Sequence, residues 1–447
     1  MLRGVLQRSV LQNILGQIAT LLIGFAPSIL VARWLGPTDR GLLAVIGTAG
    51  GIGFVLACVG LPAAVLYFAS EKSPPNAALL GNSLAYAAVL LVGLVVPTWV
   101  FRHQIADLLS DGRGEAVWVL CAVSVPATFL DWTTHNQLLG KLKFGYYNML
   151  IVGSKVVYLA GVILLLQVID LGPSGVIIAS IAGSLLVIGG SLRVILREVM
   201  PRLDRQLFRR MISYGRKSQF GSIFQLLNAR FDVLILQFFV PLSSIGYYIV
   251  AQFLVELVMV LTRSFQSSVT SLVTRDSDDP LNQAATTSTS IRHHGLLCLA
   301  ALAVNAVFSP LLIVFVYGSA FHGAILPFFI ILPGIWFLAT GLLIANDLNG
   351  RNRPGLASTL SGLGVGVTIV LDFALIPFFG VVGAAVASLL AYVAFGVASL
   401  VAESRVAQIP VRRLLPTIHD AKLYPREARR IIARLASRSS TGLRFGD

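Results

Sequence analysis

Charge is scarce in this sequence. Asp, Glu, Lys and Arg make up 12% of the 447 residues, whereas hydrophobic residues make up 56%. Soluble proteins contain about 25% charged residues, so this composition excludes an ordinary soluble fold. Cysteine is scarce as well. Cys58, Cys121 and Cys298 fall within apolar runs and show no CxxC spacing, which argues against disulfides and cysteine-based metal sites.

Motifs of catalysis are also missing. The sequence contains no P-loop, no Gly-x-Ser-x-Gly and no HExxH, which argues against P-loop nucleotide hydrolysis and the common hydrolase sites. The stretch "GGIGF" at Gly50 lies inside an apolar run and not after a strand. The loops expected outside the membrane are short, the longest covering about residues 102–114, whereas a polymerase or ligase of surface sugars needs a larger one. We therefore expect no enzyme, no cofactor and no metal site.

Long apolar runs recur along the whole chain. Runs of this length predict helices that cross a membrane. We expect an all-α polytopic membrane protein of about twelve spans, at residues 10–34, 41–69, 78–101, 115–139, 145–168, 174–196, 218–240, 244–273, 293–317, 325–349, 355–378 and 381–402.

The basic residues predict the orientation of these spans. With the N-terminus inside, the inner segments hold 27 of the 34 Lys and Arg residues and the outer loops hold four. Because Lys and Arg concentrate on the cytoplasmic side, both termini are expected to be cytoplasmic, in a bacterial cytoplasmic membrane. The net charge of +14 then reflects topology. It favours anionic inner-leaflet lipids as partners and requires no nucleic acid.

The longest inner connection divides the chain. We expect a six-helix bundle over residues 1–197, a basic linker over 198–217, a second six-helix bundle over 218–402 and a basic tail over 403–447. In the linker, Leu203, Leu207, Met211 and Tyr214 recur at helical spacing, which predicts an amphipathic helix on the inner leaflet. The basic tail has a similar pattern. It predicts an amphipathic helix that lies on the inner leaflet or binds a cytoplasmic sugar-assembly enzyme.

The first outer turns of the two halves resemble each other. "VARWLGPTDRGLLAVIGT" and "LILQFFVPLSSIGYYIVA" each contain a proline, a short polar turn and then a glycine, Gly41 or Gly246. Because six spans is an even number, such repeats are parallel and related by an axis along the membrane normal. Two bundles related in this way enclose a central cavity, as transporters do.

The same stretches carry a resemblance to a known family. "QNILGQIATLLIGFAPSILVARWLGPTDRG" resembles the opening of oligosaccharide flippases of the polysaccharide-transporter family, within the superfamily of multidrug and oligosaccharidyl-lipid exporters. "RFDVLILQFFVPLSSIGYYIVAQFLVE" resembles the matching stretch of the second half. The family usually has an aromatic residue before the first-turn glycine, where this chain has Arg40. The matching residues are Asn13, Gln17, Arg33, Leu35, Gly36, Pro37, Gly41, Asp232, Gly246, Tyr247 and Ala251.

The resemblance implies flipping of an undecaprenyl-pyrophosphate-linked oligosaccharide from the inner to the outer leaflet, for surface polysaccharide biosynthesis. It implies alternating access through a wet, cationic lumen. A cation-coupled multidrug exporter is the alternative. That activity favours deep acidic residues in the first half, where this chain has Lys155. A lipid-linked peptidoglycan-precursor flippase is expected to have fourteen spans, and a membrane polysaccharide polymerase is the remaining class.

The eighth expected span carries a polar stripe. At about 100° per residue, Gln252, Glu256, Arg263 and Gln266 fall on one side of the helix. Such a stripe faces a cavity or another helix and not lipid. We expect Arg263 to attract phosphate and Glu256 to balance it or carry a proton, with an internal ion pair as the alternative.

Other spans carry isolated polar groups. Lys155 lies near the middle of the fifth span, where it faces the lumen or a carboxylate. Arg230 and Asp232, two residues apart in the seventh span, point to different sides, so one of them is expected to pair with a neighbouring span while Arg230 faces the cavity. Asn13, Gln17 and Arg33 are further lumen candidates.

Acidic residues near span ends have other roles. Asp131 and His135 lie four residues apart on one helical face, as a proton-sensitive pair or an interfacial cap. Asp347 and Asp372 lie near span ends and are expected to anchor the helices at the interface.

Overall fold

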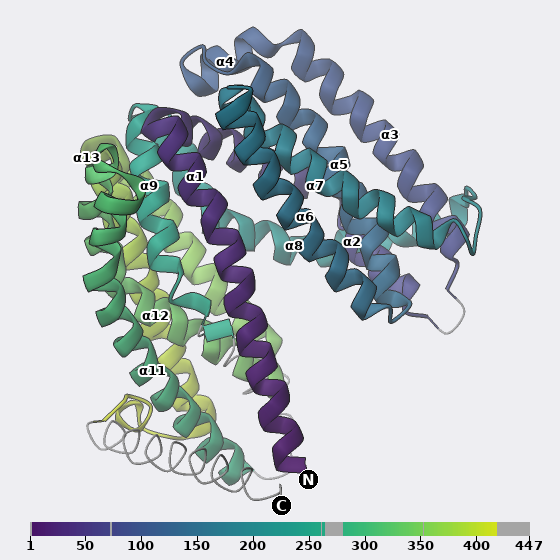
Figure 1. Cartoon of the computed structure of the whole chain (residues 1–447). Coiled ribbons are helices and arrows are strands. Elements are labelled where there is room, and N and C mark those ends of the chain that lie inside the picture. The colour runs from purple at the N-terminus through teal and green to yellow at the C-terminus, as the bar shows by residue number, and fades with distance from the viewer. Residues whose placement is uncertain (1, 72–73, 261, 264–279, 352, 418–447) are drawn as a thin grey trace, which may run out of the picture. The chain divides into compact units, whose positions relative to one another are not determined.

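The computed structural model describes residues 2–71, 74–260, 262–263, 280–351 and 353–417, except for the side chains of residues 2–23, 218, 220–229 and 280–286 (Figure 1). All regular structure in these residues is helical. The longer helices are α1 (Leu2–Cys58), α3 (Asn76–Val100), α5 (Glu115–Gly140), α6 (Phe144–Ile163), α7 (Gly172–Ile195), α8 (Arg205–Leu236), α11 (Pro280–Leu311), α12 (Ile325–Gly350) and α13 (Pro354–Ala407). The shorter ones are α2 (Leu61–Ala69), α4 (Arg102–Ser110), α9 (Leu242–Glu256), η1 (Leu164–Val168), η2 (Leu312–Tyr317), η3 (Ser319–Ala324) and η4 (Val411–Arg413).

Two of the long helices bend at a glycine. In α1 the backbone leaves helical geometry at Gly36, where φ is 75°, and in α13 it does so at Gly380, where φ is 55°. Glycine tolerates these positive φ values because it lacks a Cβ atom. Within the described residues, eight helices are long and apolar enough to cross a membrane. The chain is thus a multi-pass membrane protein, and the number of twelve spans stays a prediction.

The chain divides into two compact units, each described by itself. Among the described residues, unit 1 comprises the chain up to Phe253 together with Pro310–Phe328 and Thr368–Ala387. Unit 2 comprises Leu254–Ser309, Phe329–Val367 and the chain from Ser388 onward. The division at residues 198–217 stays a prediction.

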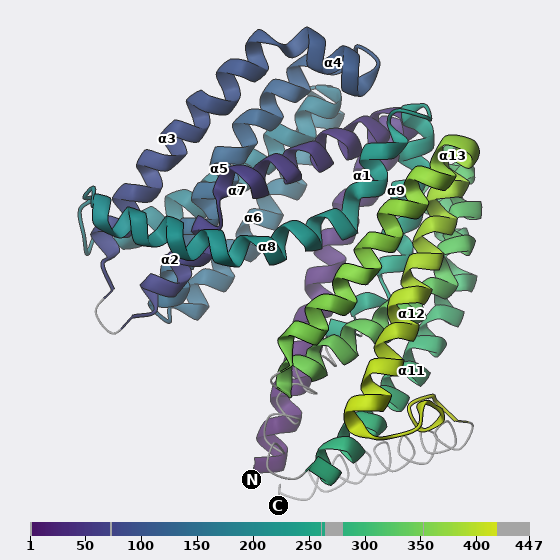
Figure 2. The ribbon, with the colours of Figure 1, turned by 180° about the vertical axis from the view of Figure 1, so that it is seen from behind.

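The basic linker helix belongs to the core of unit 1. Leu207 and Met211 are 4% and 1% exposed and pack with α2 and α3 residues, among them Val65 and Phe68. Figure 2 shows α8 running beside α2. The expectation that these two residues lie on the inner leaflet is therefore wrong, because a protein surface covers them. The helix continues without a break into the seventh expected span.

Side-chain caps explain where α8 begins. The carboxylate of Asp204 accepts a hydrogen bond from the Leu207 backbone N–H at 2.9 Å, which satisfies a donor at the helix start. Asn82 of α3 holds Asp204 from the other side, donating to its carbonyl oxygen at 2.9 Å and accepting from its N–H at 3.1 Å. These bonds fix the basic segment to the first bundle.

The two outer turns that resemble each other in sequence pack against each other. A Cβ atom added at Gly41 would lie 1.8 Å from the carbonyl oxygen of Leu242, and one added at Gly246 would lie 2.0 Å from that of Pro37. Both distances are far below van der Waals contact, so only glycine fits at either position. The turn glycines therefore serve a close approach of α1 and α9 within unit 1.

Unit 2 contains a buried ionic cluster. Arg351 bonds Asp347 at 2.6 Å and lies 3.3 Å from Glu403, and Thr287 donates to Asp347 at 2.7 Å. Asp347 and Glu403 are almost fully buried. The expectation that Asp347 anchors a helix at the interface is therefore wrong. Its charge is paired in the interior, as a buried carboxylate requires.

We expect Met211→Ala to destabilise the protein by about 2–5 kcal/mol, because it removes a fully buried side chain from a packed core. The measurement is thermal unfolding of the purified full-length protein in detergent. Met200→Ala is the matched control, since Met200 is 77% exposed and a surface substitution changes stability by about 0.5 kcal/mol or less. Equal midpoints for the two variants would contradict the buried placement of Met211.

Candidate functional site

A buried carboxylate in α8 lies at the centre of a hydrogen-bond network with α9. Asp232 accepts hydrogen bonds from the Tyr248 hydroxyl, from the Gln252 side-chain amide at 2.8 Å and from the Val233 backbone N–H at 2.7 Å. These three donors satisfy the Asp232 carboxylate in the interior, as a buried polar group requires. The network of Arg230, Asp232, Tyr248 and Gln252 is called the α8–α9 network below.

Gln252 connects two charges that point in different directions. Its amide nitrogen donates to Asp232, and its amide oxygen accepts from Arg230 at 3.2 Å. A glutamine can do this because it carries a donor and an acceptor at one end. The structure thus brings together three of the candidate residues from the sequence, Arg230, Asp232 and Gln252, and α9 contacts both charges of α8. That Arg230 faces the lumen stays a prediction.

A second buried carboxylate lies close to this network. Asp372 of α13 is fully buried, and neither of its carboxylate oxygens has a hydrogen-bond partner among the described residues. The ring of Phe373, the residue after Asp372, makes an edge contact with the ring of Phe231, the residue before Asp232, and the two ring centroids are 6.1 Å apart. The expectation of interfacial anchoring is wrong for Asp372. Asp372 stands alone within an apolar run of the sequence, and this signal could have identified it as a buried charge.

Unit 1 also contains a cavity of about 850 Å³. It extends along one face of the second half of α1, from Arg40 to Cys58, and residues of α2, α5, α6, α7 and α8 line its other sides. Most lining residues are apolar or small, including Gly47, Gly50 and Gly51. Among the described residues that line it, Arg40 alone carries a charge. Sequence reasoning placed Arg40 in an outer loop and therefore missed its position in this cavity.

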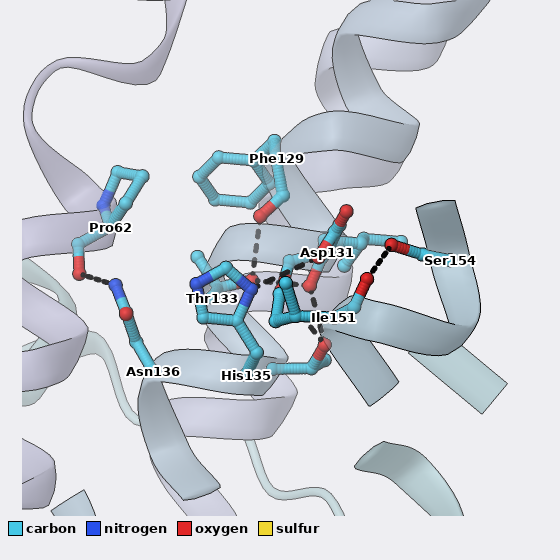
Figure 3. A network of polar contacts seen from close by, with 10 residues as sticks. Pro62, Phe129, Asp131, Thr133, His135, Asn136, Ile151 and Ser154 are labelled. Atoms are coloured by element: carbon cyan, nitrogen blue, oxygen red, sulfur yellow. Dashed lines mark hydrogen bonds and ion pairs between the residues drawn. The ribbon is translucent and has the colours of Figure 1, made fainter. Parts of the chain in front are cut away.

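The predicted pair Asp131 and His135 forms on α5 (Figure 3). The His135 Nδ1 atom and an Asp131 carboxylate oxygen are 3.0 Å apart, and both side chains are mostly buried. The next residue, Asn136, donates to the Pro62 carbonyl at 2.8 Å and so links α5 to α2. The helical spacing thus produces the contact that the sequence suggested, and its role in proton coupling stays a prediction.

The remaining candidates lie at other positions of the chain or outside the described residues. Lys155 in α6, Arg33 in α1 and Arg263 are exposed on the described chain, and Glu256 is partly buried at the end of α9. Asn13 and Gln17 lie in α1, but their side chains fall outside the description, as does Gln266 altogether. Their assignment to the lumen stays a prediction.

The fold and its buried polar groups define a class, a multi-pass membrane transporter built from two repeated helical bundles. Two solved structures show this fold. The lipid II flippase MurJ in an inward closed conformation matches with a TM-score of 0.74 at 16% identity, over 90% of this chain and 89% of that one. An inward-facing multidrug transporter of the MATE family matches with a TM-score of 0.71 at 12% identity, over 87% and 94%.

The sequence comparisons identify the family. A family model described as "Polysaccharide biosynthesis protein" matches residues 30–326, so the chain belongs to that family. The chain is also similar to a probable low-salt glycan biosynthesis flippase, Agl15, of Haloferax volcanii, with 25% identity over 366 residues, or 81% of this chain and 75% of the relative. These relatives and structural neighbours are flippases and transporters, which confirms the prediction that the chain is not an enzyme.

We expect Gln252→Leu to lower the thermal midpoint of the purified protein by several degrees. The change removes one of the three hydrogen bonds that Asp232 accepts and the hydrogen bond that Arg230 donates to the Gln252 amide oxygen, and a hydrogen bond to a charged group contributes about 1.5–3 kcal/mol. Gln167→Leu is the matched control, because Gln167 is exposed. An unchanged midpoint for Gln252→Leu would show that the α8–α9 network is not stabilising.

Proposed function

We propose that this protein flips an undecaprenyl-pyrophosphate-linked oligosaccharide from the inner to the outer leaflet of a bacterial cytoplasmic membrane. Membership of the polysaccharide biosynthesis family, together with a relative named as a glycan biosynthesis flippase, carries the proposal. The polar part of such a substrate must cross the hydrocarbon region, whereas its lipid chain can stay in the bilayer. Alternating access through a lumen meets this demand.

The cavity in unit 1 supports this role by its length. Residues Arg40 to Cys58 of α1 line it, and at 1.5 Å per residue this segment is ~27 Å long. The hydrocarbon core of a bilayer is about 30 Å thick, so the cavity extends along most of a membrane crossing. Small residues on this wall leave room for a sugar, and Arg40 disfavours an organic cation as cargo. This observation favours a flippase over a multidrug exporter.

Two buried carboxylates supply a candidate for energy coupling. Asp372 has no hydrogen-bond partner among the described residues, and its neighbour Phe373 packs against Phe231, which precedes Asp232. Two neighbouring carboxylates in a low-dielectric interior repel each other, which favours uptake of a proton or a monovalent cation between them. We propose that this pair takes part in coupling. Glu256, Asp131 and His135 remain further candidates on sequence grounds.

We expect deletion of the gene to leave complete lipid-linked oligosaccharides on the inner leaflet. The measurement labels these lipids and tests their accessibility from outside the cell, and complementation with the wild type should restore outward exposure. Arg263→Ala is expected to restore it at least tenfold less well, if Arg263 attracts the phosphate as the sequence suggests.

Two results would remove the proposal. Oligosaccharides that reach the outer face normally but stay unpolymerised would favour a polymerase. A changed drug sensitivity with normal sugar export would favour a multidrug exporter.

We expect Asp372→Asn to abolish the dependence of translocation on pH or on sodium and to slow it at least tenfold. Asparagine has nearly the same size as aspartate, but its side-chain amide is neutral. It therefore cannot take up a proton or balance the charge of a bound cation. The measurement is substrate translocation in vesicles of purified protein at several pH values and sodium concentrations. Asp170→Asn, at an exposed position, is the matched control. Wild-type ion dependence in Asp372→Asn would exclude this residue from coupling.

A further inference from the structure

Arg40 has an unusual setting for an arginine inside a membrane protein. It lines the unit 1 cavity together with Tyr158. One terminal nitrogen of the guanidinium is 3.5 Å from the Ser28 hydroxyl, which is the long limit of a hydrogen bond. Its Nε atom is buried and has no partner among the described residues. A structural arginine would have its donors filled by protein acceptors, so Arg40 retains capacity for a ligand.

No carboxylate of the described chain neutralises the charge of Arg40. No ion pair between described residues includes Arg40. The described wall of the cavity adds the neutral side chain of Tyr158 and no carboxylate. Arg230 donates to the neutral amide of Gln252. The nearby carboxylate of Asp232 is already engaged by Tyr248 and Gln252.

A buried donor of a charged group that lacks a partner is costly in a low-dielectric interior. An anion placed beside Arg40 gives the Nε donor a partner and offsets the charge of the guanidinium. A guanidinium binds phosphate through two parallel N–H donors, a geometry that an ammonium cannot reproduce. The arrangement therefore selects a phosphate or diphosphate group over a neutral sugar.

The apolar part of the cavity wall limits which groups can be attached to the bound anion. Beyond Arg40 the wall is mostly apolar and rich in small residues, so the anion must be attached to a body that tolerates apolar surroundings. The volume of about 850 Å³ lies in the usual range for a small-molecule site. It holds the phosphate-bearing end of a lipid-linked molecule and the groups next to it, and not the whole molecule.

We infer that Arg40, with Tyr158 on the same cavity wall, binds the phosphate group of the transported lipid-linked molecule at the Gly36 end of the unit 1 cavity. The inference rests on the proposed function for the identity of that molecule. Arg40 thereby becomes a specificity-determining residue that the family resemblance does not supply, because related sequences usually carry an aromatic residue at this position.

The test is binding to the purified full-length protein in nanodiscs of phosphatidylcholine. The probes are undecaprenyl diphosphate, phosphatidylglycerol and inorganic pyrophosphate. We expect undecaprenyl diphosphate to bind the wild type and to bind Arg40→Gln at least tenfold more weakly. Arg40→Lys should lie between the two, because it keeps the charge but loses the paired donors. Arg113→Gln is the matched control, since Arg113 is exposed and the same charge is removed.

Each other result has a defined meaning. Equal binding of undecaprenyl diphosphate by the wild type, Arg40→Gln and Arg40→Lys would overturn the inference and leave the proposed function intact. A loss seen only with phosphatidylglycerol would overturn it too, because an ordinary membrane lipid would then occupy the site. Absence of undecaprenyl diphosphate binding by the wild type would overturn both the inference and the proposed substrate. If Arg40→Gln fails to fold, Arg40→Lys alone decides between these results.

Discussion

The cost of placing charge inside a membrane-spanning helix governs how this protein is held together. In hydrocarbon, a helix forms all the hydrogen bonds of its own backbone. A charged side chain on it needs a partner from another segment or from water. In unit 1 the carboxylate of Asp232 obtains its partners from α9, through Tyr248 and Gln252. In unit 2, Arg351 lies between Asp347 and Glu403. Each network fixes which turns of two helices lie side by side, because sliding by one turn would separate the partners.

Many features of the fold are encoded in short stretches of the sequence and could therefore be predicted. Apolar runs and the bias of basic residues identify a polytopic transporter, and the turns around Gly41 and Gly246 indicate its two repeated halves. The family follows from the same stretches. Helical periodicity also predicted that Arg230 and Asp232 point to different sides and that one needs a neighbouring span. It could not show that Gln252 contacts both, because periodicity gives the face of a helix but not what lies opposite.

The errors have the same physical origin. An amphipathic pattern such as Leu207 and Met211 looks the same whether it covers a leaflet or a protein core, and here it covers a core. Distance from a span end placed Asp347 and Asp372 at the interface, although both are buried. Arg40 was assigned to a loop because span boundaries are uncertain by several residues. The kink at Gly36 places it at the start of a helix that lines a cavity.

The continuity of α8 links two regions that the sequence suggested were separate. Leu207 near its first turn is fixed in the core beside α2, and Arg230 near its other end lies in the α8–α9 network. Arg230 follows Leu207 by 23 positions, so at 1.5 Å per residue the two positions are ~35 Å apart along one helix. A helix transmits tilt over this length with little loss. The packing of Leu207 beside α2 and the position of the α8–α9 network therefore depend on the direction of one continuous helix.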